Sequence, residues 1–195
     1  MLYEQGVLTT RAFEECNITQ AEKVKAVHVS FIAAGAQVIQ TNTFGANRFS
    51  LGRFGVVNVV EVNAAGVRIA KEAALEGGKG TIIAGAIGPS GEGSGFLDDD
   101  KLLEIAVAFE EQIKAQVDAG VDILILETFT FLAEIKVALA TAKKLFAGPV
   151  VASMSFSDEP SATNNYGPGQ VALLLQKWGA EVVGVNCGGG WGRVG

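Results

Sequence analysis

Glu181-Val-Val-Gly-Val-Asn-Cys187 is a short run rich in valine that ends on a cysteine and is followed by Gly188. A run of this composition predicts a buried β-strand. An α/β barrel presents metal ligands and nucleophiles at the C-terminal ends of such strands. Cys187 is therefore a candidate ligand or nucleophile, although a lone cysteine after a strand is more often a small buried residue. The ends of the other strands decide between these interpretations.

The rest of the chain alternates between predicted helices and strands. Helices are expected near residues 20–34, 59–74, 101–119, 132–145 and 170–178, and strands near 38–43, 81–87, 122–127, 149–155 and 182–187. Strands that alternate with helices in this way predict right-handed βα units and a parallel sheet.

Two parallel architectures fit this alternation, a doubly wound sheet and a (β/α)8 TIM barrel. No dinucleotide-binding fingerprint follows any predicted strand, and polar residues recur at strand C-termini. Both observations favour the barrel. A complete barrel takes about 250 residues. We therefore expect an incomplete α/β barrel of five βα units, in one domain over residues 1–195, without its first strand and its last strands.

Composition and charge restrict the classes of partner. The chain is 49% hydrophobic and has a net charge of −6 without a basic cluster, which argues against nucleic acid or an anionic membrane as partner. No apolar run is long enough for a membrane span, and no secretory signal is expected. The only cysteines, Cys16 and Cys187, give no disulfide framework. A reducing, cytoplasmic setting is therefore expected.

Helix signals are clearest near the N-terminus and in the middle of the chain. Thr19 and Glu22 have the spacing of a capping box before the helix at 20–34. The buried stripe of that helix is predicted to be Val24, Val27, Phe31 and Ile32. His28 lies near this stripe; it is interpreted as a packed helix histidine rather than a ligand or base. Asp98 to Asp100 are expected to cap the helix at 101–119, and Gly120 to end it.

Polar residues and glycines follow several predicted strands. Glu127 and Thr128 end the strand at 122–127, and a carboxylate there is costly unless it has a partner or a function. The loop at 88–95 is rich in glycine and could bind a phosphorylated substrate through its backbone N–H groups. It lacks both the P-loop and the dinucleotide patterns, so a loop over the top of a barrel is favoured.

Taken together, the strand ends resemble the homocysteine S-methyltransferase family. The resemblance is to the homocysteine-binding domain found in the N-terminal region of cobalamin-dependent methionine synthase and in reductase-fused homologues. It covers nearly the whole chain, and four motifs carry it in order: Ala34–Asn47, Gly85–Pro89, Ala119–Thr128 and Gly184–Cys187.

The resemblance implies transfer of a methyl group to the thiol of homocysteine, which forms methionine. In this family zinc holds the substrate sulfur as a thiolate, through three cysteine ligands and one open position. Cys187 matches the first ligand, and Glu127 matches the carboxylate that receives the substrate ammonium group. Asn42, Thr43, Thr128 and Asn186 match positions that line the pocket. The methyl donor, whether folate, cobalamin or another, would be bound by loops or domains not present in this chain.

The sequence also departs from the family pattern. The other two cysteine ligands of the family lie in a later Gly-Gly-Cys-Cys segment, and its opening strand ends in an Asp-Gly motif; neither is found here. We therefore expect a family member truncated at both ends. The alternative is a catalytically inactive barrel fragment that serves as a binding or self-associating module and forms a homo-oligomer.

Overall fold

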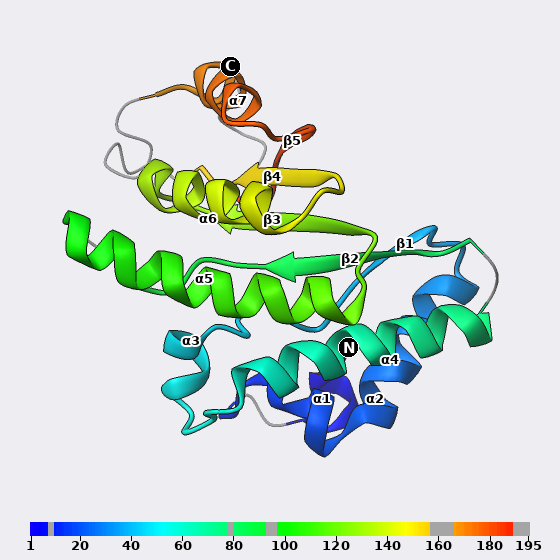
Figure 1. Cartoon of the computed structure of the whole chain (residues 1–195). Helices are drawn as coiled ribbons and strands as arrows, with labels where there is room; N and C mark the ends of the chain where they lie inside the picture. Colours follow the sequence, from blue (N-terminus) through cyan, green and yellow to red (C-terminus); the bar gives the residue numbers. More distant parts are fainter. Residues whose placement is uncertain (8–9, 78–79, 93–96, 157–165, 189–195) are drawn as a thin grey trace.

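The computed structural model describes residues 1–7, 10–77, 80–92, 97–156 and 166–188 (Figure 1). Its centre is a five-stranded, entirely parallel sheet with the order β1-β2-β3-β4-β5. The strands are β1 (Val38–Gln40), β2 (Ile82–Ile87), β3 (Ile123–Phe129), β4 (Val150–Met154) and β5 (Val182–Val185).

The strand order decides between the two predicted architectures. Each strand pairs with the next one along the chain, whereas a doubly wound sheet reverses its order at a switch point. Figure 1 shows three of the connecting helices side by side over one face of the sheet. They are α4 (Val59–Gly77), α5 (Asp99–Ala119) and α6 (Leu132–Leu145). This confirms the predicted α/β fold with the winding of an incomplete (β/α)8 barrel.

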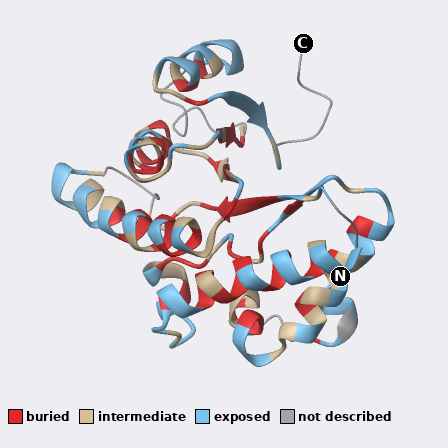
Figure 2. Cartoon of the chain, turned by 45° about the vertical axis from the view of Figure 1, so that its right-hand side comes forward, coloured by how far each residue is buried: buried red, intermediate tan, exposed pale blue. Residues whose placement is uncertain are grey.

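The two faces of the sheet are covered to different extents. In β3, Leu124 and Leu126 are fully buried against the helices, whereas Ile123 and Ile125, which alternate with them, are only half-buried. Because side chains alternate along a strand, Ile123 and Ile125 point to the opposite face, called the inner face below. The helices show the same division in Figure 2, buried toward the sheet and exposed outward.

The prediction that the Glu181–Cys187 stretch forms a buried strand is wrong. All four residues of β5 are exposed, and the exposed fraction reaches 68% at Val185 (Figure 2). The physical reason is position, because β5 lies at the edge of the sheet and only β4 pairs with it in the described chain. The strand also ends at Val185, so that Asn186 and Cys187 follow it.

Helix ends agree with the sequence where the signals are local. Asp98 caps α5 by accepting a hydrogen bond from the Lys101 N–H at 2.8 Å, and Gly120 ends it with a φ of 86°. The predicted capping box at Thr19 is wrong. Thr19 ends a separate helix, α1 (Cys16–Thr19), and its hydroxyl donates to the Glu15 carbonyl. The remaining elements are η1 (Tyr3–Gln5), η2 (Phe13–Glu15), α2 (Ala21–Ala33), α3 (Arg48–Gly52) and α7 (Pro168–Lys177).

The buried stripe of α2 also differs from the prediction. Val24, His28 and Ile32 are buried, whereas Phe31 is 50% exposed. The four-residue spacing of the buried set places it on one helix face, and Phe31 falls beside that face. His28 is therefore a packed helix residue, as the sequence indicated.

Burial of His28 predicts weaker folding in acid. The residue is 6% exposed, and desolvation lowers its pKa from 6.5 to about 4. The unfolded chain therefore binds a proton below pH 6.5 that the folded chain rejects, so stability falls as the pH drops from 6.5 toward 4. This group alone is expected to remove about 2 kcal/mol between pH 7 and pH 5. Urea unfolding at pH 7 and pH 5 measures this loss of stability. In His28→Leu the loss should be smaller by about 2 kcal/mol. A loss as large as that of the wild type would contradict the assignment of this pH effect to His28.

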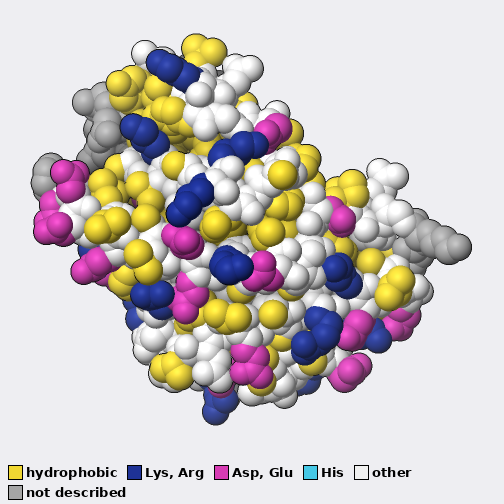
Figure 3. Space-filling view, in the orientation of Figure 1, with side chains coloured by type: hydrophobic (Ala, Val, Ile, Leu, Met, Phe, Trp, Pro, Cys, Tyr) yellow, Lys and Arg dark blue, Asp and Glu magenta, His cyan; other side chains and the backbone are white. Residues whose placement is uncertain are grey.

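The helix-covered surface carries mixed charge. In Figure 3, basic and acidic side chains are interspersed over it with apolar ones. Ion pairs join neighbouring elements there, for example Arg48 with Glu111 at 2.8 Å and Lys144 with Glu110 at 3.5 Å. None of the helices in the described segments is long and apolar enough to cross a membrane.

Candidate functional site

Glu127 is the carboxylate that the sheet presents at the C-terminal end of β3. It is half-buried and two residues beyond Ile125, so it lies on the inner face. Burial raises the pKa of its carboxyl group, and a hydrogen bond from the Gln40 side chain opposes this rise. Within the described residues no lysine, arginine or histidine forms an ion pair with Glu127. The carboxylate is therefore partly desolvated without a cationic partner.

Gln40 is a site residue that the sequence analysis did not identify. It ends β1, and its side chain forms a hydrogen bond with the Glu127 carboxylate across β2. Gln40 is in register with Ala84, and Ala84 with Ile123, so Gln40 lies on the same inner face as Ile123 and Glu127. Two residues in register on parallel strands point to the same face. The only signal in the sequence is its place near a strand end, and the register across β2 determines which face of the sheet it shares with Glu127.

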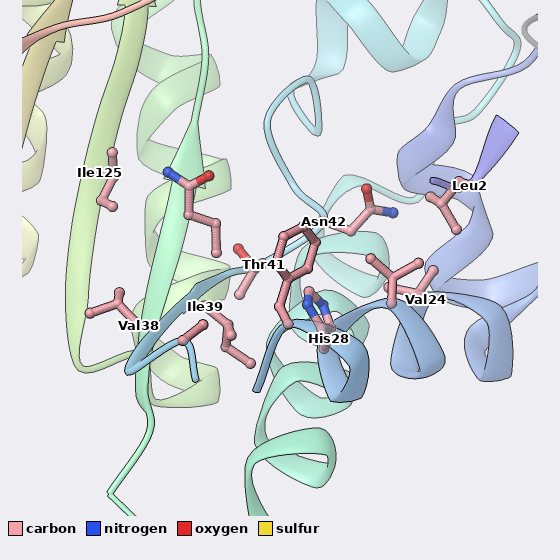
Figure 4. A pocket seen from close by; sticks show the side chains of 12 residues that line it. Leu2, Val24, His28, Val38, Ile39, Thr41, Asn42 and Ile125 are labelled. Atoms are coloured by element: carbon pink, nitrogen blue, oxygen red, sulfur yellow. The ribbon is translucent and has the colours of Figure 1, made fainter. Parts of the chain in front are cut away.

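A cavity of about 500 Å³ adjoins this pair of side chains (Figure 4). It lies between α2 and the β1 edge of the sheet, and its lining is mainly apolar. Gln40 and Ile125 belong to its wall, as do Thr41 and Asn42, so the cavity meets the inner face at Gln40 and Ile125, whereas Glu127 is not among its lining residues. His28 also lines it from α2.

Asn186 joins the ends of three neighbouring strands. Its Oδ1 accepts hydrogen bonds from the Thr128 backbone N–H at 3.0 Å and from the Ser153 hydroxyl at 2.7 Å. Its Nδ2 donates to the Thr128 hydroxyl at 2.7 Å. The structure thus brings together two predicted site residues, Thr128 and Asn186, and adds Ser153 of β4, which the sequence analysis missed.

Cys187 follows directly and carries an exposed thiol. Asn186 Nδ2 lies 3.4 Å from its Sγ, and the Ser155 hydroxyl donates to its carbonyl at 2.9 Å. Both Cys187 and Thr128 have left-handed backbones, with φ of 53° and 63°. Such a conformation costs on the order of 1–3 kcal/mol in a residue other than glycine. Backbone strain of this kind concentrates at functional sites.

Asn42 and Thr43 are held by the protein itself. Asn42 Nδ2 donates to the Phe13 carbonyl at 2.8 Å and to Asn17 Oδ1 at 3.0 Å. Thr43 is fully buried, where its hydroxyl donates to the Ala86 carbonyl and accepts from Gln116 Nε2. The structure therefore does not bring the Thr43 side chain to the inner face beside Glu127, and a substrate-binding role for these two residues stays a prediction.

The described residues do not complete a zinc site. They contain no cluster of three or more histidine, cysteine, aspartate or glutamate side chains that could hold a metal ion. Cys187 is a suitable single ligand, because its thiol is exposed at a strand end. Cys16 is buried in α1, where burial raises the pKa of its thiol. A catalytic zinc normally takes three protein ligands, so one exposed thiol among the described residues does not make such a site.

The glycine-rich loop after β2 is held by α6. Glu134 is fully buried, and its Oε1 accepts hydrogen bonds from the Ser90 backbone N–H at 2.7 Å and from the Ser90 hydroxyl. The Gly88 N–H donates to the Phe44 carbonyl. These two N–H groups are therefore engaged within the protein instead of facing a phosphate. Residues 93–96 of this loop lie outside the described residues.

Glu134 predicts a second pH effect, in the opposite direction to His28. Burial raises the pKa of its carboxyl group above 4.5, and Oε2 has no hydrogen-bond partner in the described structure. The folded chain therefore keeps a proton that the unfolded chain releases, so stability falls as the pH rises from 4.5 through the raised pKa. Glu134→Gln keeps the acceptor for Ser90 and should reduce this fall, as measured by urea unfolding at pH 5 and pH 8.

Glu134→Ala is the matched variant. It leaves the Ser90 N–H and hydroxyl without their acceptor and should cost about 2 kcal/mol at pH 5. The cost should be smaller at pH 8, because alanine also removes the buried charge. A glutamine variant that loses as much stability as the alanine variant at pH 8 would contradict the account.

The singly wound parallel sheet, with polar residues at its strand C-termini, places the chain among α/β-barrel proteins. Residues 3–191 match the model of the homocysteine S-methyltransferase family. The chain belongs to this family.

Individual relatives agree with this assignment. The chain is 32% identical over 178 residues to bovine betaine–homocysteine S-methyltransferase 1, covering 89% of this chain and 42% of the relative. It is 31% identical over 173 residues to mouse S-methylmethionine–homocysteine S-methyltransferase BHMT2, covering 89% and 45%. It thus spans less than half the length of these two relatives.

The fold likeness extends to a solved structure. The oxidized form of the homocysteine methyltransferase MmuM from Escherichia coli superposes with a TM-score of 0.77 at 22% identity, over 95% of this chain and 70% of that one.

Proposed function

We propose that the chain is a homocysteine S-methyltransferase domain that transfers a methyl group to the homocysteine thiol and forms methionine. In this reaction the thiol loses its proton, the sulfur bonds to the methyl carbon, and the bond between that carbon and the donor breaks. The proposal is supported by family membership and by one observation above all, the partly desolvated Glu127 carboxylate without a cationic partner on the open inner face.

Glu127 is proposed to bind the ammonium group of homocysteine. A charge-assisted hydrogen bond to a half-buried carboxylate is stronger than one in water, and the ammonium would offset the desolvation of Glu127. Gln40 holds this carboxylate from the side of β1. Thr128 and Asn186 are proposed to form the adjoining wall, and Asn42 the wall beyond Gln40, with Thr43 buried behind it.

Cys187 is proposed as a zinc ligand, with the other ligands outside the described residues. Zinc, when bound, lowers the pKa of a coordinated thiol and so supplies the nucleophilic thiolate at neutral pH. The contribution of the chain itself is to present the Cys187 thiol at the end of β5, anchored through its carbonyl by Ser155.

The second candidate function is a non-catalytic barrel fragment that binds another copy of itself. It is favoured by the exposed β5 edge, where Val182 is 53% and Val185 is 68% exposed. Exposed apolar edge strands invite pairing with another chain. Analytical ultracentrifugation tests this candidate, since it requires a mass that grows with protein concentration together with no methyl transfer.

The test of the proposed function is methionine formation. The purified chain is incubated with homocysteine and zinc and with each of three donors, betaine, S-methylmethionine and methyltetrahydrofolate, and methionine is quantified by mass spectrometry. Methionine above the protein-free control with at least one donor supports the proposal. No methionine with any of the three contradicts it.

A further inference from the structure

We propose that Asn186 is a positioning residue that locks the ends of β3, β4 and β5 together and so fixes the Glu127 carboxylate relative to the Cys187 thiol. This inference rests on the proposed function, in which the Glu127 carboxylate binds the substrate ammonium group and the Cys187 thiol is a zinc ligand. It assigns Asn186 and Ser153 to holding the site, in addition to any contact with substrate.

The hydrogen bonds of Asn186 carry the inference. Both of its side-chain polar atoms are engaged, Oδ1 with the Thr128 N–H and the Ser153 hydroxyl, and Nδ2 with the Thr128 hydroxyl. Nδ2 also lies 3.4 Å from Cys187 Sγ. One amide therefore contacts the residue that follows Glu127, the strand in between, and the thiol.

The backbone at these contacts needs such support. Thr128 is β-branched and has a φ of 63°, a conformation that β-branched residues rarely adopt. It lies within the register shift between Leu126 and Phe129, where β3 departs from regular pairing with β4. A strained backbone conformation persists only where surrounding contacts hold it in place. Asn186 provides such contacts, because it hydrogen-bonds both the backbone N–H and the hydroxyl of Thr128.

Cys187, which follows β5, also depends on these polar contacts for its position. β5 is an exposed edge strand, so little packing fixes the residues that follow it. Cys187 has a φ of 53°, and its described polar contacts are those with Asn186 and Ser155. The polar contacts of Ser155 and Asn186 therefore determine where the thiol points.

The consequence is a defined spacing between two chemical groups. Glu127 lies near the C-terminal end of β3 and Cys187 follows β5, and these two strands are separated by β4 alone. The lateral separation of β3 and β5 is about 10 Å, because neighbouring strands are about 4.8 Å apart. An amino thiol with its ammonium group at Glu127 can direct its sulfur toward Cys187 across this span.

Thiol labelling measures this spacing without methyl transfer. Two methanethiosulfonate reagents are compared, the cationic aminoethyl reagent and the neutral methyl reagent, with chelator present. In both reactions the Cys187 sulfur forms a disulfide and methanesulfinate leaves. The ratio of the two rates reports the negative potential at the thiol, and effects on intrinsic thiol reactivity largely cancel. Peptide mass spectrometry separates Cys187 from the buried Cys16.

At low ionic strength, the ratio of the labelling rate with the cationic reagent to the rate with the neutral reagent is expected to be about threefold higher in the wild type than in Glu127→Gln. Asn186→Ala should lower the ratio to the level of Glu127→Gln. Thr128→Val, which loses the hydroxyl, should lower it in part, whereas Thr128→Ser, which keeps the hydroxyl, should retain the wild-type ratio. Circular dichroism shows whether each variant is folded. If Asn186→Ala does not fold, the comparison of Thr128→Val with Thr128→Ser tests the inference instead.

Two results would overturn the inference. One is equal ratios in the wild type and Glu127→Gln, because the two groups would then not share a site. The other is a wild-type ratio in folded Asn186→Ala and Thr128→Val. Failure of the proposed function looks different: no methionine forms, while the labelling ratios keep the expected order.

Discussion

Glu127→Gln is expected to lower kcat/KM for methyl transfer to homocysteine by about a hundredfold. The substitution keeps the size of the side chain and its contact with Gln40 but removes the charge that would bind the substrate ammonium. Loss of a charge-assisted hydrogen bond at a half-buried site costs about 3 kcal/mol, which corresponds to that factor. Steady-state methionine formation at varied homocysteine measures it.

The matched control is Glu104→Gln, the same change at an exposed position of α5 where the carboxylate pairs with Lys101. This variant should retain wild-type kinetics, because surface ion pairs contribute little. Equal rates for the wild type and Glu127→Gln would remove Glu127 from the substrate site. Equal losses in the two variants would indicate a general effect of reduced negative charge.

Cys187→Ala is expected to have the largest effect, a loss of methyl transfer of about a thousandfold or more, together with its zinc. A metal that activates a nucleophile stabilises the transition state by several kcal/mol, and loss of a ligand removes it. Zinc per chain is measured by atomic emission on protein purified without chelator. Zinc content is expected to be higher in the wild type than in the variant, where it should fall to near zero.

Cys16→Ala is the comparison for this prediction. Cys16 is buried in α1, where it packs with Val7, Val24 and Ile69, so zinc content should be unchanged even if stability falls. Zinc near zero in the wild type, or equal zinc in the wild type and Cys187→Ala, would contradict the assignment of Cys187 as a ligand.

The sequence predicted the features that depend on local signals. The helix at 132–145 matches α6, and the Asp98 and Gly120 caps of α5 are confirmed, because capping depends on residues within one turn. The alternation of elements was sufficient to predict the parallel sheet. The capping box at Thr19 failed because an additional short helix, α1, places Thr19 at a helix C-terminus.

Features that depend on distant partners were not predicted. β5 has the composition of a buried strand, yet its burial depends on a neighbour beyond it in the sheet. Gln40 and Ser153 gain their roles from residues 87 and 33 positions away, through strand register. Glu127 and Thr128 could be predicted as candidates because they carry polar atoms at a strand end, where a barrel builds its site, whereas Asn186 was assigned through the family resemblance.

The most direct test of the central claim is calorimetric binding of homocysteine to the wild-type chain with zinc present, compared with 4-mercaptobutyric acid, which lacks the amino group. The account predicts that homocysteine binds about a hundredfold more tightly than the analogue, and that Glu127→Gln abolishes the difference. No binding of homocysteine, or equal binding of the two thiols to the wild type, would contradict the claim that Glu127 recognises the substrate ammonium group.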